Sequence, residues 1–356
     1  MLQSRLEAMD FICKRYPFGE GQDCVDNLYA RRGTSAPNFC FAGHTDVVPT
    51  GDEAKWSSEP FAGHIKNGQL WGRGAADMKG AIAAFVSALE TRLTEGWQPE
   101  GSISFLITGD EEGPAINGTI KVLDWMATNG ETIDACIVGE PTCPEKMGEM
   151  IKIGRRGSMS AWITVSGVQG HSAYPHRAKN PLPAMARLMD RLASHTFDDG
   201  TAHFDPSTLA VTTFDTGNPA TNVIPAACKS SANVRFNDLH TSATVIAWMQ
   251  TEADAVAADF GVEIDMQVRV SGESFLTPPG ALSDLVSAAV AAETGITPEL
   301  STTGGTSDAR FVKDHCPVVE FGLVGKTMHQ VDECVEIEQI GRLKSIYARV
   351  LADYFA

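Results

Sequence analysis

The chain has 356 residues, of which 43% are hydrophobic and 21% are charged, so a globular protein of more than one domain is expected rather than a disordered one. Its formal net charge of −17 opposes nonspecific binding to nucleic acid or to anionic membranes. The chain contains neither the roughly 20 apolar residues in a row that a membrane helix needs nor the apolar core of a signal peptide, so we expect a cytoplasmic protein that acts on small molecules.

The first 150 residues alternate between strand-like and helical patterns, which predicts a sheet with helices packed against it. Apolar runs of strand length occupy 39–44, 102–108 and 135–138. Helical spacing of apolar residues occupies 79–93 and 120–126.

A different order follows, from 158 to 270: strand, helix, strand, strand, helix, strand. The predicted elements are 159–166, 181–193, 209–214, 227–236, 241–258 and 262–270. This stretch is long enough to form its own domain. The earlier patterns then resume at 282–294, 317–321 and 337–354. We therefore predict an α/β fold, with a discontinuous catalytic domain of residues 1–156 and 271–356 built on a mixed sheet flanked by helices. Residues 157–270 would form an inserted α+β domain with an antiparallel sheet.

The first predicted strand ends in His44 and is followed closely by Asp46. A histidine that binds a metal commonly donates its second ring N–H to a carboxylate, and Asp46 is near enough in sequence to accept it. The alternative is a polar turn capped by Asp46. The eight cysteines are scattered without a C-x-x-C pair, so a zinc ion would be held by His, Asp and Glu.

Asp77 precedes the predicted helix 79–93, where a helix N-cap is the ordinary role for aspartate. The segment also resembles a dinucleotide-binding loop, because Gly72 and Gly74 follow a short strand-like stretch. However, Asp77 occupies the place of the third glycine, and its carboxylate would repel a pyrophosphate. A nicotinamide-dependent dehydrogenase is therefore the weaker alternative.

The strand 102–108 leads directly into Asp110, Glu111 and Glu112. Like charges this close raise one another's pKa unless a cation neutralises them, so the cluster either faces water as a turn or surrounds a metal. Glu140, after the third strand, and His329, near the C-terminus, carry little information alone.

Taken together, these residues predict a metal centre. Two histidines and three carboxylates suit two zinc ions that share a bridging carboxylate, which leaves Glu111 free to act as a base. The predicted ligands are His44, Asp77, Glu112, Glu140 and His329.

Four motifs, at 43–49, 72–80, 108–113 and 139–142, resemble the dinuclear zinc amidohydrolases that include acetylornithine deacetylase, aminoacylase and the glutamate-releasing carboxypeptidases. Five more, at 154–158, 170–175, 221–225, 304–308 and 328–329, are similar to members that act in lysine and diaminopimelate biosynthesis. Those members cleave N-succinyl-LL-2,6-diaminopimelate to succinate and LL-2,6-diaminopimelate.

The resemblance implies a role for each predicted site residue. His44 and Glu140 would hold one zinc ion, Glu112 and His329 the other, and Asp77 would bridge them, with Co²⁺ as a possible substitute. Asp46 would orient His44. Glu111 would take a proton from the zinc-bridging water that attacks the succinyl amide, and would deliver it to the departing amine.

The resemblance also implies that the insert mediates a homodimer and acts as a lid. His171 would reach the active site of the partner and stabilise the oxyanion. A core or surface histidine is the alternative reading of His171.

An anionic substrate needs local positive charge and backbone donors, which Arg155, Arg235 and the loop 304–307 offer. Arg156 is a further candidate. The predicted substrate-binding residues are Arg155, Ser158, Tyr174, Asn222, Arg235, Gly305 and Thr306.

Two other functions remain open from the sequence, namely a related deacylase and an inactive binding member of the same fold. Glu111 argues against the second, because binding alone needs no base. The chain also departs from the family in two places. Gly325 replaces an asparagine that many relatives carry, so one contact to the substrate is either lost or made by other groups. The chain also begins later than relatives usually do, so it is either naturally short or its true start lies upstream. Loss of the helix with which relatives begin would uncover apolar surface on the catalytic domain.

Overall fold

The computed structural model describes residues 1–356 and divides them into two compact units. The first comprises Met1–Gly154, Thr277–Ser301 and Ser307–Ala356, and the second comprises Arg155–Leu276 and Thr302–Thr306. The predicted insert covered 157–270 only. The short loop 302–306 joins the second unit, although it lies far from the insert in sequence. No helix in the structure combines the length and the apolar character needed to cross a membrane.

The first unit is built on an eight-stranded sheet in the order β1-β2-β6-β3-β7-β18-β8-β17. β3 runs parallel to β6 and β7, and β7 runs parallel to β18, whereas β1, β2 and β6 pair antiparallel. The predicted mixed sheet is therefore confirmed. The strands are β1 (Ile12–Phe18), β2 (Val25–Arg32), β3 (Asn38–His44), β6 (Ser102–Thr108), β7 (Ala135–Val138), β8 (Met150–Lys152), β17 (Glu299–Ser301) and β18 (Val318–Glu320).

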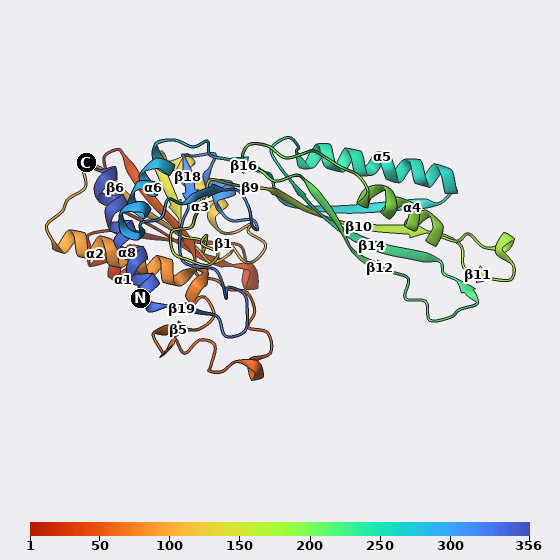
Figure 1. The fold of residues 1–356 in the computed structure, drawn as a ribbon, viewed down its shortest axis with the longest axis horizontal. Coiled ribbons are helices and arrows are strands. Elements are labelled where there is room, and N and C mark those ends of the chain that lie inside the picture. The colour runs from red at the N-terminus through yellow and green to blue at the C-terminus, as the bar shows by residue number, and fades with distance from the viewer. The chain divides into compact units, whose positions relative to one another are not determined.

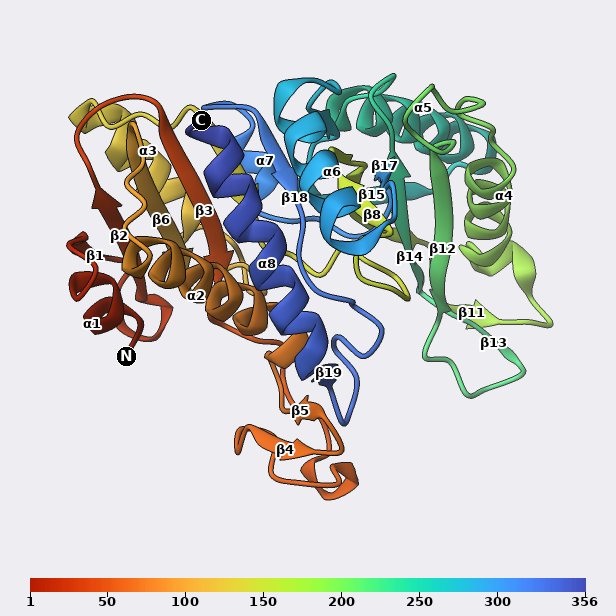
Figure 2. The ribbon, with the colours of Figure 1, turned by 60° about the vertical axis from the view of Figure 1, so that its left-hand side comes forward.

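Helices cover this sheet, as the ribbon in Figures 1 and 2 shows. α2 (Gly80–Thr94), α6 (Ala281–Thr294) and α8 (Ile337–Tyr354) pack together in front of the strands in Figure 2. α3 (Thr119–Asn129) and α7 (Ala309–Val312) lie behind them in that view. β3 and β6 are buried along their whole length, which explains why they read as continuous apolar runs rather than as alternating patterns.

Smaller elements complete the first unit. α1 (Leu2–Glu7) packs on β1 and β2, and a three-stranded sheet has the order β19-β5-β4. The strands of this sheet are β4 (His64–Lys66), β5 (Gln69–Trp71) and β19 (Cys334–Glu336).

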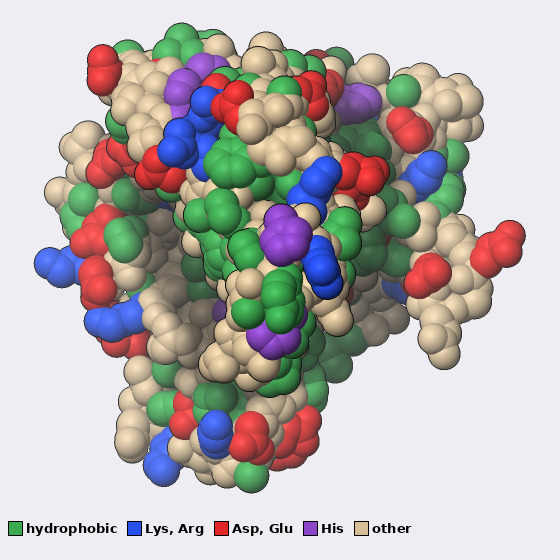
Figure 3. Space-filling view, turned by 90° about the vertical axis from the view of Figure 1, so that its right-hand side faces the viewer, with side chains coloured by type: hydrophobic (Ala, Val, Ile, Leu, Met, Phe, Trp, Pro, Cys, Tyr) green, Lys and Arg blue, Asp and Glu red, His purple; other side chains and the backbone are tan.

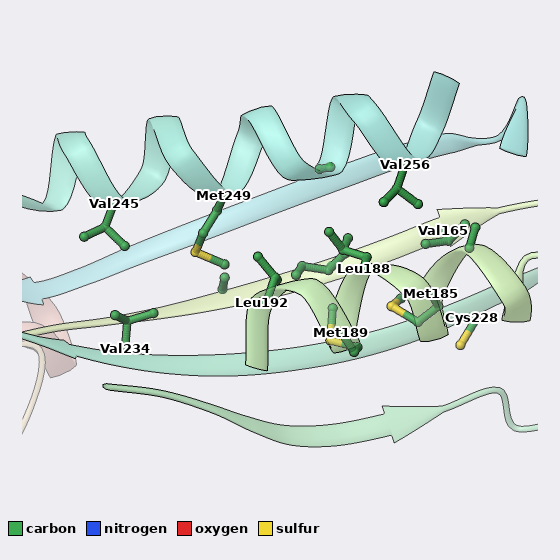
Figure 4. Close-up of a cluster of buried hydrophobic side chains, with 14 of the residues drawn as sticks. Val165, Met185, Leu188, Met189, Leu192, Cys228, Val234, Val245, Met249 and Val256 are labelled. Carbon is green, nitrogen blue, oxygen red and sulfur yellow. The ribbon is translucent and has the colours of Figure 1, made fainter. Parts of the chain in front are cut away.

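The second unit is built on a four-stranded antiparallel sheet in the order β12-β14-β10-β15. Its strands are β10 (Gly157–Ser166), β12 (Thr208–Asp215), β14 (Ala227–Phe236) and β15 (Glu263–Gly272), and its helices are α4 (Leu182–Ala193) and α5 (Ser242–Phe260). Figure 4 shows Leu188 and Met249, from the two helices, directed toward the strands, where they meet residues such as Val165. Alternate residues of β10 and β14 form this core, as a sheet covered on one face requires.

One buried carboxylate holds the loops of the second unit together. Asp198 accepts hydrogen bonds from Asn237 Nδ2 at 2.6 Å, from the backbone N–H groups of Gly200 and Ser207, and pairs with His240 Nε2 at 3.1 Å. Burial alone would raise the pKa of Asp198, but these hydrogen bonds outweigh it and lower the pKa.

We expect Asp198→Ala to reduce the free energy of unfolding by about 1–3 kcal/mol, because it leaves buried donors without an acceptor. Urea unfolding measures this, with the exposed neighbour Asp199 changed to Ala as the control. Because the folded-state pKa lies below the unfolded value of about 3.9, the contribution is present at neutral pH and is lost as the pH falls below about 4. This explanation would be wrong if the difference in free energy of unfolding between the two variants were the same at pH 7 and below about pH 4.

Candidate metal centre

Three strands deliver polar side chains to one edge of the large sheet. His44 is the last residue of β3, Glu111 and Glu112 follow the end of β6, and Glu140 follows the end of β7. β3 pairs in parallel with both β6 and β7, so the carboxyl ends of the three strands meet. This edge is the usual location of binding sites in open α/β sheets.

Asp77 lies between the two histidines. Its Oδ1 is 3.2 Å from His44 Nε2, and its Oδ2 is 3.0 Å from His329 Nε2. His329 Nε2 is also 2.9 Å from Glu112 Oε1, and His44 Nε2 is 3.8 Å from Glu140 Oε1. The structure therefore brings together all five residues that the sequence suggested as metal ligands.

Neither alternative role of Asp77 fits this geometry. Asp77 belongs to the irregular segment Ala75–Lys79 and has φ −118° and ψ 97°, whereas the N-cap of α2 is Lys79. The helix-cap reading is therefore wrong. The dinucleotide loop is wrong as well, because the strand before Gly72 is β5, which pairs antiparallel with β4 and β19 instead of entering a parallel sheet.

The donor chemistry of the cluster fits two divalent cations. Three sets of side chains have ligand atoms that lie within 4.8 Å of one another, namely His44, Asp77 and Glu140, then Asp77, Glu112 and His329, and then His44, Glu111 and Glu112. Each set offers one nitrogen and two carboxylates, which suit zinc. Asp77 belongs to the first two sets. Several carboxylates this close together and this buried are unfavourable without positive charge, which a bound cation supplies.

The acids around the two histidines raise the pKa of both. Burial alone would lower the pKa of His44, but Asp46 and Asp77 outweigh it and raise the pKa to about 12. Asp77 raises the pKa of His329 to about 9, against the opposing effect of burial. Burial would raise the pKa of Asp77, yet its hydrogen bonds with His329 and His44 lower it.

Glu111 and Glu112 are not a solvated turn. Their side chains are only 11% and 13% exposed, and Glu111 Oε2 lies 4.0 Å from His44 Nε2. Burial, followed by the charge of Glu140, raises the pKa of Glu111 well above its ordinary value. A carboxyl group with this tendency to bind a proton, beside a metal site, has the properties of a proton carrier. Asp110 has a separate role, because its Oδ2 accepts the backbone N–H groups of Ile116 and Asn117.

Asp46 connects the histidine to the acidic segment. Its Oδ1 is 3.5 Å from His44 Nδ1, and its two carboxylate oxygens accept the backbone N–H groups of Glu111 at 3.3 Å and Glu112 at 2.9 Å. The backbone carbonyl of Asp46 is closer to His44 Nδ1, at 3.1 Å. Asp46 thus lies beside the imidazole ring and also holds the backbone of both glutamates.

The remaining predicted residues belong to the second unit, where they form two groups. Arg235 of β14 lies opposite Ser158 of β10, and Arg155 Nη1 donates to the carbonyl of Thr303, next to Gly305 and Thr306 in the loop 302–306. Arg235 is half-buried, and burial followed by the charge of Arg156 lowers its pKa.

His171, Tyr174 and Asn222 form the second group. His171 lies on the short strand β11 (Gly170–His171), which pairs with β13 (Val223–Ile224), and its ring contacts that of Tyr174. All three side chains are exposed, so the core reading of His171 is wrong. Figure 3 faces the side of the molecule where β11 lies in Figure 1, and shows histidine side chains among hydrophobic and basic ones. β11 follows the Ser166 end of β10 and β13 precedes the Ala227 end of β14, whereas Ser158 and Arg235 pair at the other end of these strands, so the two groups lie at opposite ends of the unit.

Two residues beside the metal centre were not predicted as part of it from the sequence. Arg73 and Glu333 form a buried ion pair at 2.7 Å, and Glu333 accepts the backbone N–H of Asp77. Their only local signal is their closeness in sequence to Asp77 and His329. Nothing in the sequence alone indicates that they meet each other.

The model of peptidase family M20/M25/M40 matches residues 40–353. A succinyl-diaminopimelate desuccinylase of Ruegeria pomeroyi is 65% identical, with 100% of this chain and 93% of that protein covered. One of Cereibacter sphaeroides is 62% identical over 100% and 93% of the two chains.

Solved structures share the fold at low sequence identity. Aminopeptidase PepT from Bacillus cereus has a TM-score of 0.80 at 20% identity, over 98% of this chain and 90% of that one. The metallo-carboxypeptidase Sso-CP2 from Sulfolobus solfataricus has a TM-score of 0.76 at 16% identity, over 98% and 91%.

Proposed function

Because the chain belongs to peptidase family M20/M25/M40, we propose that it is a metal-dependent amide hydrolase that cleaves N-succinyl-LL-2,6-diaminopimelate to succinate and LL-2,6-diaminopimelate. The observation that carries the reaction type is Asp77, which lies between His44 and His329 with Glu111 beside them. The substrate is proposed from the desuccinylases that are 62% to 65% identical over the whole chain.

The five clustered residues would hold two ions. His44 and Glu140 would bind one, Glu112 and His329 the other, and Asp77 both, with zinc as the proposed metal and Co²⁺ as a substitute. When bound, such ions polarise the amide carbonyl and make water easier to deprotonate.

Glu111 would move the proton. It would accept a proton from the water that attacks the amide carbonyl and donate it to the departing amine nitrogen. Its burial and its distance of 4.0 Å from His44 Nε2 support this role, since a carboxyl group beside the ligands can hold the proton between the two steps. Asp46 would keep the imidazole of His44 and the backbone of Glu111 in place throughout.

Two arginines would bind the carboxylates of the substrate. Arg235 and Arg155 offer guanidinium groups, which pair with carboxylates through two parallel hydrogen bonds. Ser158, across the sheet from Arg235, and the backbone of Gly305 and Thr306 would add further donors.

We expect Arg235→Ala to raise KM about 10- to 100-fold while kcat changes far less, because a charge-assisted hydrogen bond is worth about 1.5–3 kcal/mol. Steady-state kinetics on N-succinyl-LL-2,6-diaminopimelate measures both constants. Arg269→Ala is the matched control, because Arg269 is an exposed arginine of β15, on the other side of β10, where it pairs with Ser160. An unchanged KM for Arg235→Ala would remove Arg235 from the substrate site.

His171 is proposed to serve the active site of a second copy of the chain. Ser158 and Ser166 lie at the two ends of β10, which at about 3.3 Å per residue separates them by roughly 26 Å. A small substrate bound by Arg235 therefore cannot also reach His171, Tyr174 or Asn222 of the same chain. A homodimer formed through the insert would remove this difficulty, with His171 as the donor to the oxyanion. Analytical ultracentrifugation, which measures the mass of the particle in solution, tests whether the chain forms this dimer. Cytoplasmic location stays a prediction.

The substrate is tested by assaying the purified, zinc-loaded protein against N-succinyl-LL-2,6-diaminopimelate, N-acetylornithine and N-acylated amino acids. We expect the succinyl amide to have the largest kcat/KM. A preference for another amide would reassign the substrate within the family. Hydrolysis of none of them would favour a binding protein of the same fold.

A further inference from the structure

The buried Arg73–Glu333 ion pair stands beside the metal centre without belonging to it. Arg73 is 5% exposed and Glu333 is fully buried, and Arg73 Nη1 lies 2.7 Å from Glu333 Oε2. Burying two charges costs several kcal/mol per ion in lost hydration, which is of the order of what the pair recovers. The pair therefore does not by itself show that it stabilises the folded protein. Its other contacts indicate its role.

The second oxygen of Glu333 holds the segment that carries Asp77. Glu333 Oε1 accepts the backbone N–H of Ala76 at 2.9 Å and of Asp77 at 3.1 Å. This segment has no regular helical conformation at Asp77, so the hydrogen bonds of α2 do not determine where the Asp77 carboxylate points. Glu333 supplies that constraint from the other end of the chain.

Arg73 holds the segment that carries His329. Its Nη1 donates to the carbonyl of Gln330 at 3.1 Å, and its Nη2 lies 3.4 Å from the carbonyl of His329. His329 and Asp332 have φ values of 64° and 61°, in the left-handed region that non-glycine residues rarely adopt. A segment with this unfavourable backbone needs outside contacts to stay in place, and the guanidinium group makes several of them.

We infer that the Arg73–Glu333 pair is a positioning device, which sets the separation of Asp77 and His329 and thereby the affinity of the ion that these residues would share with Glu112. The inference rests on the proposed function only in taking these residues as metal ligands. Arg73 and Glu333 contact neither substrate nor reacting atoms. They act through the backbone on either side of the ligands.

The test measures Zn²⁺ affinity of the full-length chain by competition with a chromogenic chelator, and the absorption spectrum of the Co²⁺ form. Glu333→Gln keeps the shape of the side chain but weakens its acceptor. Arg73→Lys keeps the charge but cannot reach every acceptor at once, and Arg73→Met removes the donors. Arg31→Met is the matched control, because Arg31 pairs with Glu131 at 2.6 Å in the same unit and contacts none of the metal-site residues.

We expect Glu333→Gln and Arg73→Met to weaken one of the two Zn²⁺ sites about 10- to 100-fold and to alter the Co²⁺ spectrum, with a smaller effect for Arg73→Lys. Arg31→Met should change neither. Unchanged Zn²⁺ affinity and spectrum in Glu333→Gln would overturn the inference. So would a loss of affinity that is fully accounted for by unfolding of the metal-free variants, measured by circular dichroism. If the unaltered chain itself bound no Zn²⁺, the proposed function would fail instead.

Discussion

Replacing Glu111 with glutamine is expected to lower kcat about 10²- to 10⁴-fold while two metal ions remain bound. Glutamine has nearly the same shape but cannot accept and return a proton. Glu111 is not one of the five proposed ligands, and glutamine keeps an oxygen in the set that Glu111 forms with His44 and Glu112, so the ions should stay in place. KM for the succinyl amide should change little, because the side chain is proposed to move a proton rather than to bind a substrate carboxylate.

Glu112→Gln is the matched comparison, since the two glutamates are adjacent and both are held by Asp46. Glu112 Oε1 contacts His329 and is proposed as a ligand, so this variant should lose metal affinity, and excess Zn²⁺ should restore part of its activity. Metal analysis beside steady-state kinetics distinguishes the two roles. A full rate in Glu111→Gln would mean that another group accepts the proton.

Asp77→Ala is expected to abolish measurable hydrolysis and to reduce bound metal from about two ions per chain to less than one. Asp77 is the only residue that contacts both histidines, at 3.2 Å and 3.0 Å, so its removal damages both ligand sets at once. By contrast, loss of Glu140 or Glu112 would remove one carboxylate from one set.

Elemental analysis after gel filtration measures the metal, and the succinyl amide assay measures the activity. Asp124→Ala, an exposed acid on α3, controls for the loss of one negative charge. Asp77→Ala protein that retained two tightly bound ions would show that the bridging assignment is wrong, even if activity were lost. Thermal unfolding with and without Zn²⁺ adds a check, because a ligand that binds only the folded protein raises its stability.

Local pattern was sufficient for most of the regular structure. The predicted segments 102–108, 135–138, 227–236 and 337–354 coincide with β6, β7, β14 and α8 residue for residue. These elements are long or deeply buried, so the spacing of their apolar residues reflects a single environment. The clustering of His44, Glu111 and Glu140 could also be predicted from the sequence, because side chains that follow neighbouring parallel strands lie together at the carboxyl ends of those strands.

Long-range contacts supplied what local pattern could not. The irregular backbone at Asp77, the meeting of Arg73 with Glu333 and the attachment of the loop 302–306 to the second unit all depend on partners that are distant in sequence. The placement of His171 and Arg235 at opposite ends of the second unit, on two different sheets, likewise follows from strand pairing.

The spacing of apolar residues thus specified the helices and strands, and the residue types specified the kinds of metal ligand. Both signals depend only on residues that are close together in the chain. Folding decided which carboxylate lies between the two histidines and which buried pair holds it there. A carboxylate has the same local sequence signature whether it caps a helix, faces water or binds a metal. Only its neighbours in space distinguish these roles.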